Sequence, residues 1–164
     1  MAISASAALW FLPFVLPICF YVAFTDMREM RITNQAVVAL AVVFLIVGLI
    51  ALPLPIYGMR FLQLFGVLII GILLNAGGAI GAGDAKFAAA ATPFIAPGDL
   101  RLMLIIFSAN LLAAYLTHRL AKHSPLRRVA PNWESWNRGW DFPMGLALGG
   151  TLAIYLIMGG HYGM

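Results

Sequence analysis

The sequence predicts an all-α, polytopic integral membrane protein with about six transmembrane helices. Of its 164 residues, 63% are hydrophobic and only 10% are charged, with a mean hydropathy of +0.95. A soluble domain of this size needs far more charge to cover its surface. The apolar residues also form long uninterrupted blocks, so lipid is the expected solvent. The length suits one transmembrane domain over residues 1–164.

Six blocks without charged residues define the expected spans, because a membrane-crossing helix needs about 20 apolar residues. The blocks at 1–25, 32–59, 61–83 and 142–164 meet this length, 102–117 is slightly short, and 87–98 must borrow from its flanks. A cleavable signal peptide has a basic start. No Lys or Arg precedes Arg28, so we expect the first block to remain as a span.

The basic residues predict the orientation, because Lys and Arg concentrate on the cytoplasmic side of a membrane. With six spans and both termini outward, the inner loops hold eight of the ten basic residues, and the outer loops hold Arg60 and Arg101. Without a span at 87–98 the division would be four against six, so six spans are preferred. In either arrangement the loops at Asp26 and Asp84 share one side. We expect a multi-pass protein of the inner (cytoplasmic) membrane.

The segment 118–141 is the longest polar stretch and is expected to face the cytoplasm. It contains five basic and two acidic residues, together with Trp133, Trp136 and Trp140. Aromatic residues gather at membrane interfaces, and basic residues bind anionic lipid. We therefore expect an interfacial belt that contacts membrane lipid. The alternative is a segment that guides a substrate.

Two of the six acidic residues are candidates for chemistry, because a carboxylate beside hydrocarbon is costly and usually functional. Asp26 directly follows the first block, and Asp84 follows a run of four glycines at 77, 78, 81 and 83. Asp26 could instead be a solvated residue paired with Arg28. Asp84 could be a helix N-cap, although a cap needs no glycine cluster. Bare backbone there would leave room for an extended peptide.

Together, the two aspartates suggest a proton-sharing pair. Like charges a few ångströms apart cannot both ionise easily, so one carboxyl stays protonated. The ionised member would activate water, and the protonated member would donate to a peptide carbonyl. Cys19 is the only cysteine, and the three histidines lack zinc-ligand spacing. We expect no metal, no cofactor and no nucleic-acid partner.

Three stretches resemble the type IV prepilin peptidases, which are membrane aspartyl peptidases of the GxGD group. Residues 81–87, GAGDAKF, resemble the family's G-x-G-D-x-K motif. Residues 26–34, DMREMRITN, resemble its first motif, with Thr33 in place of proline. Residues 142–147, FPMGLA, resemble its Pro-x-Gly stretch. The resemblance implies that Asp26 and Asp84 are catalytic. It gives supporting or substrate-binding roles to Gly81, Gly83, Lys86, Arg28 and Asn34.

The resemblance also implies a substrate and a place of action. It implies an endopeptidase that removes the leader of a prepilin at the cytoplasmic face, just before the hydrophobic helix, during pilus assembly. The match is to the short form without a methyltransferase domain, as in tight-adherence (Flp) pilus systems. Archaeal preflagellin peptidases are near relatives.

Two other functions stay open. The chain could be a small carrier or channel component in which Asp26 and Asp84 bind ions or protons, as midplane sites do in transporters. It could also be a non-catalytic pilus-assembly factor. Placing both aspartates near one membrane face favours the peptidase. Asp99 is expected on the opposite face.

Overall fold

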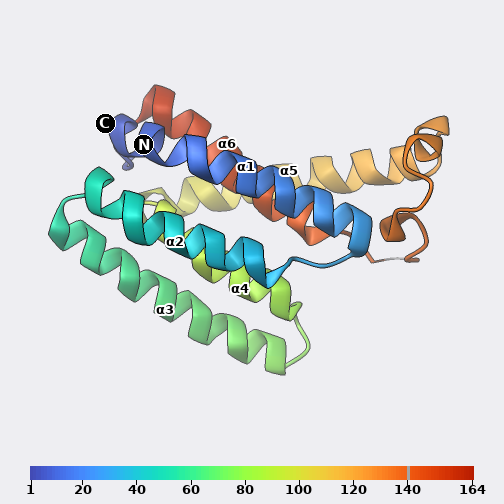
Figure 1. Ribbon diagram of the computed structural model, residues 1–164, viewed down its shortest axis with the longest axis horizontal. Helices are drawn as coiled ribbons and strands as arrows, with labels where there is room; N and C mark the ends of the chain where they lie inside the picture. The colour runs from blue at the N-terminus through green and yellow to red at the C-terminus, as the bar shows by residue number, and fades with distance from the viewer. Residues whose placement is uncertain (140) are drawn as a thin grey trace.

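A computed structural model describes residues 1–139 and 141–164 as a bundle of helices (Figure 1). The helices are α1 (Ala5–Glu29), α2 (Asn34–Ala51), α3 (Leu54–Ala76), α4 (Ala82–Ala91), α5 (Leu100–Lys122) and α6 (Met144–Tyr162). Short 3₁₀ turns are η1 (Thr92–Phe94), η2 (Pro97–Asp99), η3 (Pro125–Val129) and η4 (Glu134–Trp136). The described residues contain no strand, which confirms the all-α prediction. Trp140 of the predicted aromatic belt lies outside them.

Five helices are long and apolar enough to cross a membrane: α1, α2, α3, α5 with the preceding η2, and α6. Their outer faces expose large apolar side chains that water would not tolerate, such as Phe20 (70% exposed) and Leu73 (67% exposed). Lipid chains solvate such apolar faces, while the backbone N–H and C=O groups form hydrogen bonds within each helix. The protein is therefore a polytopic membrane protein.

The sixth segment, residues 82–99, connects the two ends of the bundle without a membrane-length helix. Asp84 in α4 lies at the end where α1 finishes, whereas the Asp99 carboxylate accepts hydrogen bonds from the amides of Ala2 and Ile3, just before α1 begins. Pro93 and Pro97 fall in η1 and η2, and proline cannot continue an α-helix. The short block 87–98 is thus extended by its N-terminal flank: the ten-residue helix α4, Ala82–Ala91, is followed by two 3₁₀ turns.

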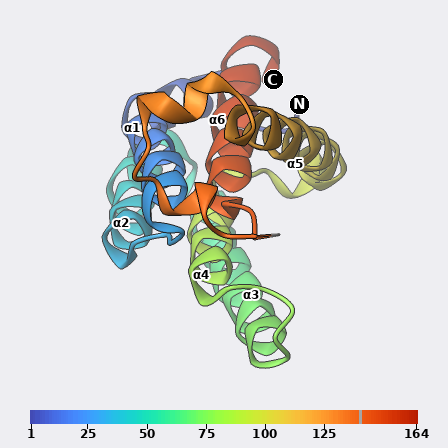
Figure 2. The ribbon, with the colours of Figure 1, turned by 90° about the vertical axis from the view of Figure 1, so that its right-hand side faces the viewer.

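Helices α1 and α6 form the centre of the bundle and lie side by side along its length (Figures 1 and 2). Glycine permits the close approach: a Cβ on Gly149 would lie 2.8 Å from the carbonyl oxygen of Cys19. Gly145 stands four residues earlier on α6, so the two glycines share one helix face. Helix α2 covers the other side of α1, while α3 and α5 lie at the edges, with few buried residues.

One boundary differs from the prediction. The second block was expected to end at Arg60, with Arg60 in an outer loop, but α2 ends at Ala51 and α3 begins at Leu54. Pro53 causes the break, because the residue before a proline is driven out of helical conformation. Arg60 is instead buried in α3, and its guanidinium donates to the carbonyl of Ile95.

Candidate functional site

The Asp26 carboxyl group is held in the last turns of α1 by the start of α6. Its Oδ2 accepts a hydrogen bond of 2.6 Å from the backbone amide of Gly145, and the side chain is buried. A Cβ on Gly145 would lie 2.8 Å from the Cβ of Asp26. Only glycine lets α6 approach this closely, and an amide donating to a carboxylate forms a strong, short bond. The Pro-x-Gly stretch therefore builds part of the Asp26 environment.

The Asp84 carboxyl group lies in the first turn of α4, opposite Asp26. Gly81 is the N-cap residue of the helix, so Asp84 is not the cap. The Gly81 backbone lies against the Asp84 carboxyl, since a Cβ on Gly81 would lie 2.8 Å from its Oδ2. Burial raises the pKa of Asp84, and the nearby Gly81 backbone opposes part of that rise.

The glycine run allows α3 to turn back into α4. Gly78 has a φ of +74°, a left-handed conformation that side chains disfavour. Gly83 fits against the segment between α1 and α2, since a Cβ there would lie 3.3 Å from the Cβ of Ile32. The run thus sets the turn and the close packing that carry Asp84 to the end of α1.

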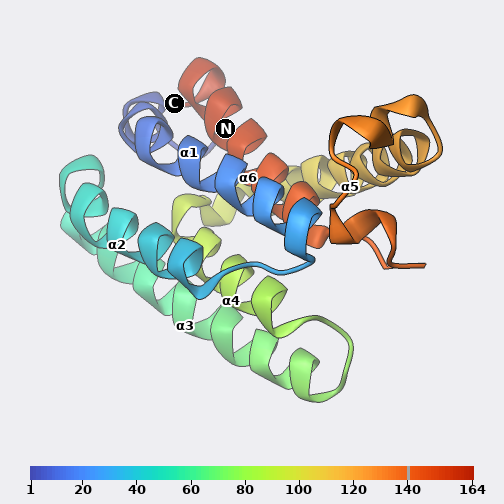
Figure 3. The same ribbon diagram turned by 45° about the vertical axis from the view of Figure 1, so that its right-hand side comes forward.

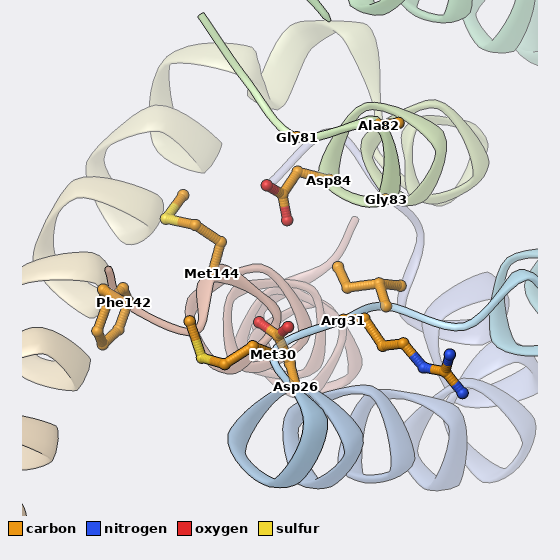
Figure 4. Close-up of a pocket in the computed structure, with 10 residues that line it drawn as sticks. Asp26, Met30, Arg31, Gly81, Ala82, Gly83, Asp84, Phe142 and Met144 are labelled. Carbon is orange, nitrogen blue, oxygen red and sulfur yellow. The ribbon is translucent and has the colours of Figure 1, made fainter. Parts of the chain in front are cut away.

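The two carboxyl groups face each other across a pocket of about 300 Å³ (Figure 4). The described residues that line the pocket are Asp26, Met30, Arg31, Ile32, Gly81, Ala82, Gly83, Asp84, Phe142 and Met144. No group of three His, Cys, Asp or Glu residues in the described part of the chain is placed to hold a metal ion. The arrangement can position a water molecule between two carboxyls.

Of the five supporting residues that the sequence suggests, Gly81 and Gly83 line the pocket. The Lys86 ammonium instead donates to the Asn34 side chain at 3.2 Å, which ties α4 to α2. Arg28 pairs with Glu29 at 3.0 Å, and its guanidinium lies 6.0 Å from the centre of the Phe24 ring. These three residues support the elements around the pocket and do not line it.

Several lining residues had no prediction of their own. Met30 ends α1 with a φ of 51°, a left-handed conformation that is rare outside glycine. Met144 and Phe142 reach the pocket from the start of α6 and the segment before it. Only the Pro-x-Gly stretch indicated this region, because apolar residues carry no separate sequence signal in a membrane protein.

An aromatic stack connects the polar segment 123–141 to this end of the bundle, where Figure 3 shows it beyond the end of α5. Trp133 packs edge-on against Phe24 of α1 and stacks on Trp136, which in turn stacks on His118 of α5. His118 also contacts Phe142, a lining residue of the pocket. The segment therefore lies at the same end as the two carboxyls.

One known protein family matches the chain over more than half of its length. A model of the type IV leader peptidase family matches residues 13–117, well over half of the chain. The chain belongs to the type IV leader peptidase family. The matched stretch contains both Asp26 and Asp84, while α6 with Gly145 lies beyond it. No curated protein and no solved structure gives a significant match.

Membership of the type IV leader peptidase family supports a membrane peptidase whose substrates are of the prepilin type.

Proposed function

We propose that the protein is an aspartyl endopeptidase that removes the leader of a Flp-like prepilin at the cytoplasmic face of the inner membrane. The observation that carries the proposal is the pair of facing carboxyl groups, Asp26 and Asp84, in one pocket. Two carboxyls at short range share a proton, which gives the site one base and one acid.

The mechanism uses water as the nucleophile. The ionised carboxyl takes a proton from water as its oxygen attacks the carbonyl carbon of the scissile peptide bond. The protonated carboxyl donates to the carbonyl oxygen, which gives a tetrahedral gem-diol intermediate. The carboxyl that took the proton from water then gives it to the amine nitrogen and the C–N bond breaks, while the other carboxyl takes its proton back from a hydroxyl of the intermediate as the new carboxyl group forms. The two carboxyl groups titrate as one unit, so the role of the acid belongs to the pair and not to one aspartate.

The neighbours of the pair support this chemistry. The amide of Gly145 holds one oxygen of Asp26 by a hydrogen bond, and the Asp84 carboxyl packs against Gly81. Positioned groups react faster because their orientation is set before the substrate arrives. Gly81 leaves room for the Asp84 carboxyl, and Gly83 leaves room for Ile32, so this wall packs closely around the pair.

The cytoplasmic location is supported by charge. Eight of the ten basic residues belong to the ends and loops around the pocket, whereas Arg60 and Arg101 belong to helix ends remote from it. Moving Arg60 into α3 therefore leaves the eight-to-two division intact. Positively charged residues remain on the cytoplasmic side, so the pocket is expected there, with both termini outward.

The proposal is tested by reconstituting the purified chain in lipid vesicles with a prepilin-type protein. Mass spectrometry of the products should find one cut, just before the apolar segment of the substrate. Cleavage that persists in a metal chelator would agree with the carboxyl mechanism. An uncut substrate together with proton or ion flux through the vesicle membrane would favour the carrier alternative.

A further inference from the structure

A second hollow, which we call the apolar groove, begins where the carboxyl pocket ends. It has a volume of about 720 Å³ and lies among α3, α4, α5 and α6. Gly81, Asp84 and Met144 line both the groove and the pocket. A chain that passes between the two carboxyls can therefore continue directly into the groove.

Two of the walls of the groove are stripes along α4 and α6. On α4 and the following turn the lining residues are Asp84, Phe87, Ala88, Ala91 and Thr92, and on α6 they are Met144, Leu148, Thr151 and Leu152. Each set is spaced by three or four residues along its helix, with adjacent pairs, which places it on one helix face. Each stripe starts at a residue of the carboxyl pocket, so the groove extends from the site into the depth of the membrane.

The two threonine hydroxyls that line the groove form hydrogen bonds within the protein. The Thr92 hydroxyl donates to the carbonyl of Ala88 at 2.7 Å. The Thr151 hydroxyl donates to the carbonyl of Ala147 at 2.7 Å and accepts from Asn110 at 3.1 Å. An occupant needs no hydrogen-bonding side chains here. The groove thus suits an apolar helix, which satisfies its own backbone.

We propose that the apolar groove binds the first turns of the hydrophobic segment that follows the scissile bond of the substrate. This inference rests on the proposed function. The groove is continuous with the carboxyl pocket. In the proposed function, the apolar segment of the substrate begins directly after the scissile bond, so it is the part of the substrate that would enter the groove. Asp84 and Thr92 are eight residues apart, which corresponds to ~12 Å, or about two helical turns of substrate. Ala88 lies halfway between Asp84 and Thr92 along this wall.

Disulfide cross-linking tests the contact directly. The chain carries Cys19→Ala to remove its only cysteine and Asp26→Asn to keep the substrate uncut. Ala88→Cys is then compared with Ala113→Cys, which lies on an exposed face of α5 outside the groove. The substrate carries one cysteine about one turn after the scissile bond. We expect an oxidant to link the substrate to position 88 and not to position 113.

Three results would overturn the inference while the chain without these substitutions still cleaves the same substrate. They are no link at position 88, equal links at positions 88 and 113, and a dimer of the peptidase linked through position 88. A chain that cleaves no prepilin-type substrate would contradict the proposed function itself. The cleavage assay thus separates the two failures.

A filling variant gives a second readout. Ala88→Phe should lower kcat/KM on the membrane-embedded substrate by at least about tenfold, because the ring occupies the groove, while Ala113→Phe should stay within about twofold. Equal rates for the two variants would contradict the proposal. If Ala88→Phe fails to fold, the cysteine comparison decides alone, since cysteine is close to alanine in size.

Discussion

At the scale of single residues, the position of the Asp26 carboxyl group depends on Gly145, which lies 119 residues later in the chain. The Gly145 amide donates to it at 2.6 Å, and the absence of a side chain at position 145 allows the approach. Met30, which ends α1 in a left-handed conformation, lines the same pocket. The geometry of the pocket thus depends on the backbone at Gly145 and Met30 as well as on the aspartate side chains.

The first prediction concerns Gly145→Ala. The added methyl would lie 2.8 Å from the Asp26 Cβ, so α6 must move and the bond to the carboxylate lengthens. We expect a loss of at least about tenfold in kcat, because misplacing a catalytic group is costly. Gly66→Ala in α3 is the control, since a Cβ there meets nothing within 4 Å. Unchanged cleavage by Gly145→Ala would remove this glycine from the site.

The second prediction concerns the stability of the Asp84 environment. Burial raises the pKa of Asp84, so the folded state holds the proton more tightly than the unfolded chain. This contribution to stability is present at low pH and is lost as pH rises through the folded-state pKa. Asp84→Asn should therefore raise the Tm at neutral pH, with a smaller gain near pH 4. A lower Tm for the variant at neutral pH would contradict this assignment.

At the scale of elements, Asp99 connects the turn before α5 to α6 and to the start of the chain. Its carboxylate accepts from the amides of Ala2 (2.7 Å) and Ile3 (3.1 Å) and from the Tyr155 hydroxyl (2.8 Å). The Tyr155 oxygen in turn accepts from the amide of Ala96. A residue that the sequence placed simply on the far face is therefore a structural anchor.

The third prediction follows from this anchor. Asp99→Asn replaces an acceptor of three hydrogen bonds with an amide that carries its own donors, so the folded state should lose about 1–3 kcal/mol. Cleavage per folded molecule should remain near normal, because Asp99 is remote from the pocket. Glu134→Gln, which removes an exposed ion pair to Arg138, should change stability by less than about 1 kcal/mol. Thermal unfolding in detergent would compare them, and equal Tm values would contradict the anchor.

The elements themselves were largely predictable, because hydrophobic length and charge alone mark membrane spans. The boundary at Pro53 was missed because the blocks were delimited by charged residues, and Arg60 is a charge inside a helix. Asp26 and Asp84 had signals in the sequence, namely their positions beside apolar blocks and the glycines before Asp84. The partnership of Asp26 with Gly145 had none, because it depends on how α6 packs against α1.

At the scale of the whole molecule, the two ends of the bundle differ in character. One end carries the carboxyl pocket, most basic residues and the aromatic stack on His118. The other carries the Asp99 anchor and the two termini, which lie together (Figure 1). This polarity is what a peptidase working at one membrane face requires.

The fourth prediction tests this orientation. Single cysteines at positions 29 and 127 on a Cys19→Ala background should react with a membrane-impermeant reagent from the cytoplasmic side. A cysteine at position 98, in the exposed part of η2, should react from the opposite side. Reaction of positions 29 and 127 from different sides would contradict the arrangement of the bundle.

The central claim, that Asp26 and Asp84 form one catalytic unit, is tested most directly by the cleavage rates of Asp26→Asn, Asp84→Asn and the double variant. Asparagine keeps the shape but cannot exchange a proton. We expect each single variant to lose at least about a thousandfold in kcat while still accumulating in the membrane, with little further loss in the double variant, because groups that act as a unit are non-additive. Glu29→Gln, three residues from Asp26 and paired with Arg28 and Arg31, should show only a modest loss. Near-normal cleavage by either single asparagine variant would contradict the account.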